Sequence, residues 1–311
     1  MTNKSDNNLI SVIMNCHNSE KYLSESIESV LNQTYKKWEI IFWDNASTDK
    51  SADIFKSYKD DRLKYFYSDD FTSLGHARNL AIEKSKGEFI AFLDCDDLWY
   101  PMKLEKQIEL FENKLIGIVI SDTLFFNDKK IIRQHYKNFK PPVGNVFRHL
   151  LSSYFISLET AVIRKKALLK LDHYFDNRFE VIEEYDLFIR LCFHHHLGYV
   201  DQVLAKWRVH ANSLTWKKSN LFIDETRIFL LKISKLIPDF EYLYKKEKNE
   251  ILDSINFKDA LNEWSLGNNF QSRKIILSLN KKRKKAKLVY ILTFFLPFRI
   301  FDYLNKIRIG L

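Results

Sequence analysis

The chain of 311 residues is long enough for one large domain or one domain with an appendage, and its hydrophobic content of 46% can fill a sizeable core. Seven glycines and five prolines are too few for a disordered or loop-rich chain. The three cysteines, Cys16, Cys95 and Cys192, show no paired spacing, which argues against a disulfide framework or a zinc site and indicates a reducing compartment.

The net charge of +9 is unevenly distributed along the chain. Segment 273–311 carries 11 Lys and Arg residues against one acid, whereas the remainder carries 38 basic and 39 acidic residues. A nearly neutral body argues against a groove for nucleic acid, and the basic tail predicts a localised anionic partner. The apolar run 9–14 is too short for a secretory signal, so we expect a cytoplasmic protein.

Short apolar runs alternate with helical patterns over the first 125 residues. The predicted strands are 10–14, 38–43, 63–67, 89–93 and 116–120, and the predicted helices are 19–33, 47–58, 75–84 and 101–113. This alternation predicts βαβ units and a mostly parallel sheet with helices on both faces. The alternation then weakens: we expect a loop at 137–146, a strand at 160–163, a helix at 184–194, strand and loop at 199–209, and helices from 219 onward.

The strand predicted at 89–93 ends in three carboxylates, Asp94, Asp96 and Asp97. Burying a charge is costly unless the charge is paired or bound to metal, so this cluster needs a positive partner. Ligands bind at the carboxyl ends of parallel strands, and alternate residues of an extended segment share a face. Asp94 and Asp96 therefore suit Mg²⁺ or Mn²⁺ carrying a diphosphate. The alternative is that Asp97 caps the next helix.

A second carboxylate, Asp44, ends the strand predicted at 38–43. At this position it can accept hydrogen bonds from a nucleotide base or from ribose hydroxyls. The alternative is an Asx-type turn with helix capping by residues 47–49, and the two interpretations are compatible.

Five segments, 11–18, 22–35, 44–49, 75–79 and 94–97, follow one another in the order and at the spacing of known motifs. Together they resemble inverting glycosyltransferase family 2, over roughly residues 9–215. The resemblance implies the A-type glycosyltransferase (GT-A) fold, a Rossmann-like α/β domain over 1–215. Its nucleotide-binding half would be 1–125 and its acceptor half 126–215. A helical extension, 216–280, and a basic amphipathic tail, 281–311, would follow.

The resemblance also implies site residues. The positions that would bind the nucleotide-sugar are Asn15, Asp44, Arg78, Asp94 and Arg208, with Asp96 on a divalent metal, Mn or Mg. Arg78 would lie near the nucleotide or support the Asp-x-Asp loop. Such a metal stabilises the charge that grows on the departing diphosphate. The chain departs from the family motif at Asn45 and Ala46, where the family has Asp and Gly.

The base that activates the acceptor hydroxyl is expected among Glu183, Glu184 and Asp186. On the family match Glu184 takes the base position, where Asp is usual, and Asp186 is a close rival. Glu183 would touch the metal or the acceptor. The alternative is that these acids complement the dipole of a helix N-terminus.

The segment that begins at Arg208 resembles the family's Arg-x-His-x-x-Ser pattern. Arg208 can pair with phosphate, and a neutral His210 can ligate the metal. The Gln-x-x-Arg-Trp signature of processive synthases is absent, which favours transfer of a single sugar. Three consecutive helical side chains diverge, so tract 194–196 is predicted to be a polar helix end and not a metal site.

The tail joins a basic cluster, 281–287, to an apolar and aromatic run, 288–301. The apolar stretch is too short to span a bilayer of about 30 Å. It favours an in-plane anchor on anionic lipid, and the alternative is a helix that packs on the domain.

These features predict an enzyme that transfers one sugar from a nucleotide-sugar, with a UDP-sugar favoured, to a hydroxyl of a lipid-linked or cell-surface glycan, with inversion. Lipopolysaccharide or capsule synthesis at the inner face of the cytoplasmic membrane would be its setting. Two alternatives stay open: a nucleotidyltransferase, and a non-catalytic, membrane-tethered protein that binds glycan or nucleotide.

Overall fold

The computed structural model describes residues 8–210, 218, 221–279 and 284–309. They form two compact units. The first unit runs to Phe147 and resumes at 155–208, and the second contains 148–154 and the residues from Val209 onward.

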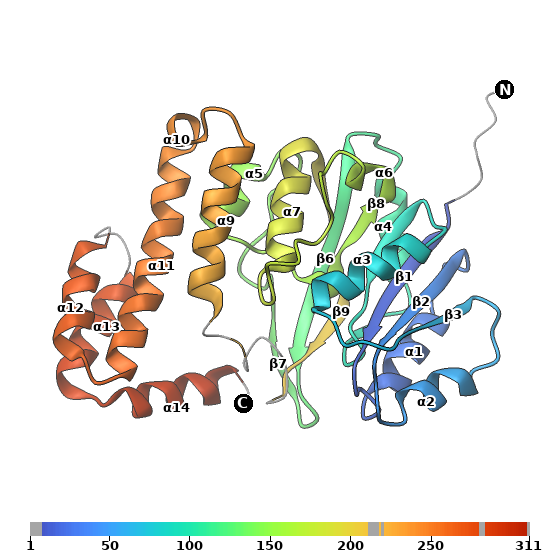
Figure 1. Ribbon diagram of the computed structural model, residues 1–311, viewed down its shortest axis with the longest axis horizontal. Helices are drawn as coiled ribbons and strands as arrows, with labels where there is room; N and C mark the ends of the chain where they lie inside the picture. Colours follow the sequence, from blue (N-terminus) through green and yellow to red (C-terminus); the bar gives the residue numbers. More distant parts are fainter. Residues whose placement is uncertain (1–7, 211–217, 219–220, 280–283, 310–311) are drawn as a thin grey trace. The chain divides into compact units, whose positions relative to one another are not determined.

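A single mixed β-sheet forms the centre of the first unit (Figure 1). Its strands are β1 (Ile10–Cys16), β2 (Trp38–Asn45), β3 (Leu63–Ser68), β4 (Phe89–Phe92), β5 (Leu98–Trp99), β6 (Ile116–Phe126), β7 (Ile131–Gln134), β8 (Val162–Arg164) and β9 (His196–Arg208). The strand order is β3-β2-β1-β4-β8-β6-β9-β5, with β7 paired to β6. The long pairings, β1 with β2, β2 with β3 and β6 with β9, are parallel, as expected, whereas the short β8 is antiparallel to both its neighbours.

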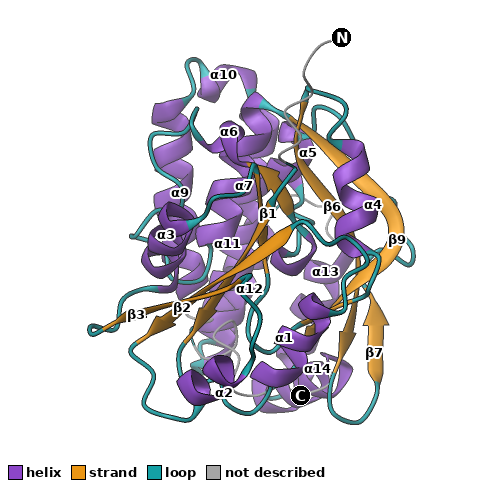
Figure 2. Cartoon of the chain, turned by 90° about the vertical axis from the view of Figure 1, so that its right-hand side faces the viewer, coloured by secondary structure: helices purple, strands orange, loops and turns teal. Residues whose placement is uncertain are grey.

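Helices cover both faces of this sheet (Figure 2). They are α1 (Leu23–Leu31), α2 (Ser51–Ser57), α3 (Leu74–Lys84), α4 (Lys103–Leu110), α6 (Lys165–Leu168) and α7 (Glu183–His194), with a 3₁₀ turn at Leu158–Thr160. Helix α1 turns Leu23, Ile27 and Val30 to the sheet, the spacing of an amphipathic helix. Every residue of β2 is buried, as expected for a central strand covered on both faces.

The structure extends or trims several predicted elements. Helix α1 begins at Leu23 and not at Ser19. The backbone N–H of Ser19 donates instead to the hydroxyl of Ser51, the first residue of α2, and that of Glu20 donates to Asp49 in the loop before α2. Strand β6 continues to Phe126, well beyond the predicted end at residue 120, because β9 pairs along its whole length. Tract 194–196 is the predicted helix end: α7 ends at His194 and β9 begins at His196.

The second unit is helical, as the sequence predicts. It contains α9 (Phe222–Leu236), α10 (Phe240–Leu243), α11 (Lys245–Ser265), α12 (Asn269–Ser278), α13 (Lys284–Phe295) and α14 (Phe298–Ile309), and it shares α5 (Phe147–Ser152) with the first unit. Trp264 of α11 is buried against the rings of Phe298 and Phe301. Among the described residues, no helix combines the length and apolar character that a membrane crossing requires.

Candidate active site

Asp44 lies at the carboxyl end of β2 and is fully buried. Its Oδ1 accepts a hydrogen bond from the backbone N–H of Ser47 at 2.9 Å, and its Oδ2 accepts one from the Tyr65 hydroxyl at 2.7 Å. The Asx-type turn is therefore present, and Tyr65 adds a partner that the sequence did not indicate. Each oxygen has a further lone pair, so binding of a ribose or base by Asp44 stays a prediction.

The departures from the family motif at Asn45 and Ala46 have structural consequences. The Asn45 side chain donates to Thr72 O at 2.9 Å and accepts from the Thr72 hydroxyl at 3.0 Å, which joins the end of β2 to the loop before α3. Ala46 has φ +58°, the left-handed conformation that glycine adopts without strain.

An aromatic pair lies beside these strand ends. The rings of His17 and Phe71 are 4.5 Å apart, and Phe71 is 62% exposed. The His17 ring is oriented by a 2.9 Å hydrogen bond between its Nδ1 and the carbonyl of Asn45. Nearby in the chain, both polar atoms of the Asn15 side chain are buried without a hydrogen-bond partner among the described residues. No sequence pattern indicated the aromatic pair, because Phe71 is an isolated aromatic residue in a loop.

Arg78 of α3 connects two carboxylates from distant parts of the chain. Its Nη2 lies 2.9 Å from Asp94 Oδ1, and its Nη1 lies 2.7 Å from Glu183 Oε1. Burial alone would lower the pKa of Arg78, but the charges of Asp94, Glu183 and Glu184 outweigh burial and raise it. The guanidinium therefore brings the loop after β4 and the first turn of α7 together.

Negative charge is concentrated around this arginine. Burial, reinforced by the charge of Asp96, raises the pKa of Asp94 in spite of Arg78. Burial and the charge of Glu183 raise the pKa of Glu184 well above its ordinary value. A divalent cation held by Asp94 and Asp96 would lower the pKa of Asp94 by compensating this charge. The oxygen donors Asp94 and Asp96 are of the type that Mg²⁺ and Mn²⁺ prefer, so the donor set fits the expected metal.

Arg208 is engaged with acidic groups of the protein. Its Nε donates to Asp96 O at 2.9 Å, and its terminal nitrogens lie 3.0 Å from Asp128 and 2.7 Å from Glu25. Its backbone N–H donates to Asp97 at 2.8 Å. Asp97 thus binds the end of β9 and does not cap a helix, and Arg208 fixes the loop that carries Asp96. A contact between Arg208 and phosphate stays a prediction.

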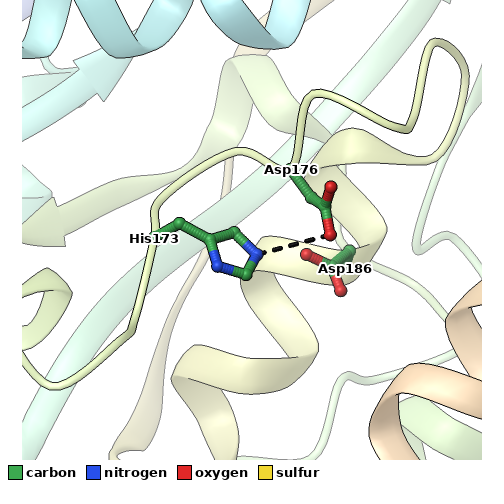
Figure 3. A group of neighbouring side chains, drawn as sticks. All are labelled: His173, Asp176 and Asp186. Carbon is green, nitrogen blue, oxygen red and sulfur yellow. Dashed lines mark ion pairs between the residues drawn. The ribbon is translucent and has the colours of Figure 1, made fainter.

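Asp186 differs from the other acids of α7. It is fully buried, and its Oδ2 lies 2.7 Å from Nη2 of Arg190, one helical turn further along. Figure 3 shows its approach to His173 and Asp176, a group whose ligand atoms lie close enough to hold a metal ion. Arg178 already neutralises Asp176 at 2.6 Å, as Arg190 neutralises Asp186. The group is therefore a paired ionic network in which each of the two acids has its own arginine partner.

His210 belongs to the second unit, so its role as a metal ligand stays a prediction. Residues 211–215 of the predicted Arg-x-His-x-x-Ser segment, which include Ser213, lie outside the described residues.

Comparisons with known proteins identify the family of this chain. The model of the family described as "Glycosyl transferase family 2" matches residues 11–185. The chain is 29% identical over 215 residues to the UDP-Glc:alpha-D-GlcNAc-diphosphoundecaprenol beta-1,3-glucosyltransferase WfgD of Escherichia coli, which covers 68% of this chain and 82% of that protein.

Two solved structures share the fold. S. aureus TarS in complex with UDP-GlcNAc superimposes with a TM-score of 0.64 and 20% identity, over 91% of this chain and 79% of that one. The mannosyltransferase PcManGT of Pyrobaculum calidifontis, in complex with GDP-Man and Mn²⁺, superimposes with a TM-score of 0.60 and 16% identity, over 97% and 85% of the two chains. The expected GT-A architecture is confirmed.

Proposed function

We propose that this chain, which belongs to glycosyl transferase family 2 and is a glycosyltransferase, moves a single sugar from a nucleotide-sugar to a hydroxyl of a lipid-linked or cell-surface glycan, with inversion. The observation that carries the proposal is the position of Arg78 between Asp94 and Glu183. It brings the acidic loop suited to a metal-bound diphosphate next to the acids suited to activating an acceptor.

The nucleotide would bind at the ends of β1, β2 and β4. The exposed Phe71 and its partner His17 offer a surface for base stacking, and the Asn15 amide and Asp44 offer hydrogen bonds to base or ribose. Asp94 would contact the ribose. A UDP-sugar is the favoured donor, because WfgD is named for UDP-Glc and TarS was solved with UDP-GlcNAc.

Asp96, with His210 as a further candidate, would hold Mn²⁺ or Mg²⁺. When bound, the cation supplies electrostatic stabilisation of the departing diphosphate. The acidic cluster around Arg78 and the Mn²⁺ of PcManGT support this assignment. Arg208 would keep the loop of Asp96 in place through its contact with the Asp96 carbonyl.

Glu184 is the proposed general base. It would take the proton of the acceptor hydroxyl while that oxygen attacks the anomeric carbon and the bond from this carbon to the diphosphate breaks. Attack from the face opposite the leaving group inverts the anomeric centre. Asp186 is the weaker candidate, because its carboxylate is already paired with Arg190 in the core. Glu183, paired with Arg78, would position Glu184 or the acceptor.

The acceptor is proposed to be anchored in a membrane, since WfgD is named for a diphosphoundecaprenol-linked substrate. The second unit offers a surface suited to lipid. Leu288, Ile291 and Phe295 recur at helical spacing on the exposed side of α13, whereas Ala286 and Val289 are buried on its other side. The basic cluster 281–287, of which 281–283 lie outside the described residues, would attract anionic headgroups at the inner face of the cytoplasmic membrane.

Binding of UDP with and without Mn²⁺, measured by calorimetry, tests the donor site. We expect Mn²⁺ to tighten the binding of UDP. Asp96→Asn should reduce this metal-dependent increase in affinity about tenfold or more. Asp61→Asn, which changes an exposed residue before β3, is the control.

A panel of UDP-, GDP- and dTDP-sugars, each incubated with the protein and acceptor extract, tests the reaction. A donor that the enzyme uses should release a nucleoside diphosphate. Release of pyrophosphate from a nucleoside triphosphate would support the nucleotidyltransferase alternative instead.

A further inference from the structure

Two thiols contact each other at the edge of the sheet: Cys16 is the last residue of β1, and Cys95 lies in the turn after β4. The parallel register pairs Ile10 with Phe89 and Ile13 with Phe92, and the Leu93 N–H donates to Ile13 O at 3.1 Å. The chain leaves the sheet after Leu93, and Cys95 lies in a turn in which the Asp97 N–H donates to Asp94 O at 3.1 Å. Both cysteine side chains belong to the same buried cluster.

The contacts of the two cysteines bring their side chains close together. Cys95 Sγ donates to Asn15 O, the residue before Cys16, at 3.2 Å. Cys16 Sγ lies 3.7 Å from the Ser47 hydroxyl, in the turn that follows Asp44. The contact with Cys95 lowers the pKa of Cys16 to about 7 despite burial, whereas burial alone raises the pKa of Cys192 in α7. The pair is thus distinct from an ordinary core cysteine.

We propose that Cys16 and Cys95 form a reversible disulfide that changes the conformation of the loop 94–97 and thereby controls binding of the nucleotide. The first half of this inference stands on the contacts and the shared burial of the thiols, and the second half rests on the proposed function of the loop. The site is a modification site for a peroxide or another small oxidant.

The chemistry balances with a peroxide as the oxidant. The Cys16 sulfur attacks one oxygen of hydrogen peroxide, the O–O bond breaks, and the second oxygen leaves as water after taking the thiol proton. The Cys95 sulfur then displaces the oxygen from Cys16, and its proton leaves with that oxygen as a second water. The two thiols lose two electrons in total, and a dithiol reductant reverses the reaction by exchange.

Forming the bond changes the loop after β4. Cys95 stands between Asp94 and Asp96, and forming the bond removes its hydrogen bond to Asn15 O. A shift of Cys95 toward β1 therefore moves both carboxylates that are proposed to bind the donor and its metal.

The test uses the full chain, oxidised with hydrogen peroxide and then re-reduced with dithiothreitol. Peptide mapping by mass spectrometry without reduction should find residues 16 and 95 cross-linked. Hydrogen exchange of the peptide that spans 93–98 should change about fivefold or more on oxidation, a readout that needs no nucleotide. UDP affinity with Mn²⁺ should fall about tenfold and return on reduction.

Variants separate this pair from general oxidation. Cys16→Ser and Cys95→Ser should each abolish the cross-link and the response to peroxide, whereas Cys192→Ser should respond like the wild type. Absence of the cross-linked peptide from folded wild-type protein overturns the inference, and so does a cross-link that leaves hydrogen exchange unchanged. If the cross-link forms and exchange changes but the reduced protein binds no UDP, the disulfide stands and the proposed donor site fails.

Discussion

Nη1 of Arg78 lies 2.7 Å from Oε1 of Glu183, although 105 positions separate the two residues. Both side chains are almost completely buried. The same guanidinium also contacts Asp94. Arg78 therefore binds one acid from the nucleotide-binding half of the predicted domain and one acid from the acceptor half. The geometry of the candidate active site therefore depends on this arginine.

Arg78→Ala is expected to destabilise the protein strongly. Removing one partner of a buried ion pair costs about 3–5 kcal/mol, because the remaining charge is left without compensation. The free energy of unfolding in urea measures this effect. Lys140→Ala is the matched control: the Lys140–Asp201 pair has a similar distance, 2.8 Å, but both side chains are exposed, so the expected change is about 1 kcal/mol or less. Equal effects of the two substitutions would contradict the structural role of Arg78.

Glu184→Gln is expected to reduce kcat by about 10²–10⁴-fold, the typical contribution of a general base. Its stability should equal or exceed that of the wild type. The raised pKa of Glu184 means that the folded protein disfavours the ionised carboxylate, so a neutral amide removes a cost that is present at neutral pH. Steady-state kinetics and urea unfolding measure the two effects on one variant.

Asp186→Asn should affect stability more, and catalysis less, than Glu184→Gln does. It leaves the guanidinium of Arg190 buried without its carboxylate, so we expect a loss of stability of about 3–5 kcal/mol. The folded fraction of this variant should retain more of the wild-type kcat than Glu184→Gln does. The reverse order of the two kcat values would make Asp186 the base.

The pH dependence of kcat/KM should report Glu184 in the free enzyme. The base must be ionised to accept a proton, and burial together with Glu183 raises its pKa well above 4.5. The rate should therefore rise with pH on the acidic side and become constant above the raised pKa. Below that pKa, kcat/KM should fall about tenfold for each pH unit, with UDP affinity measured in parallel to exclude loss of the donor. A rate that stays constant down to pH 4.5 would be incompatible with a raised pKa of the base.

Much of this arrangement follows from local sequence. The apolar run of β4 and the acids after it predicted a ligand site at a strand end, and Asp94 does reach a buried cation. One available signal was missed: Asp186 and Arg190 are four residues apart on a helix, a spacing that favours an ion pair and weakens Asp186 as a base.

Other contacts could not be predicted from local patterns. The partner of Asp44, Tyr65, is brought to it by the pairing of β2 with β3, and Phe71 reaches His17 from an irregular loop. No periodicity encodes either contact, because each depends on the path of the chain between elements. The resemblance to a family indicated that Arg78 lies near the nucleotide or supports the loop after β4, but it did not indicate the contact of Arg78 with Glu183.

Ala46→Gly should stabilise the protein by up to about 1 kcal/mol. The left-handed conformation costs an L-residue about 1–2 kcal/mol, and the greater freedom of glycine in the unfolded chain offsets about 0.5–1 kcal/mol of the gain. Ala52→Gly, within α2, is the control and should have the opposite sign, because glycine disfavours a helix. Thermal or urea unfolding measures the change in stability of each variant. A loss of stability in both variants would show that the backbone at Ala46 is not strained.

The exposed side of α13 should govern binding to anionic vesicles. Removing the tail after Asn280 is a poor test, because Val289 of α13 and Phe298 of α14 pack in the same core as Trp264. Leu288→Ser combined with Phe295→Ser changes only exposed side chains. We expect sedimentation with vesicles of phosphatidylglycerol and phosphatidylcholine to weaken about tenfold, since each apolar side chain contributes on the order of 1 kcal/mol when partly inserted.

The control for this experiment is Leu231→Ser, which removes an equally exposed leucine from α9. It should leave vesicle binding unchanged, and binding of the wild type should fall with added salt because the basic cluster 281–287 acts through headgroup charge. If the α13 double variant and the α9 control bind equally well, the lipid contact does not lie on α13. The basic cluster would then attract the chain to the surface without insertion, and binding would depend on salt alone.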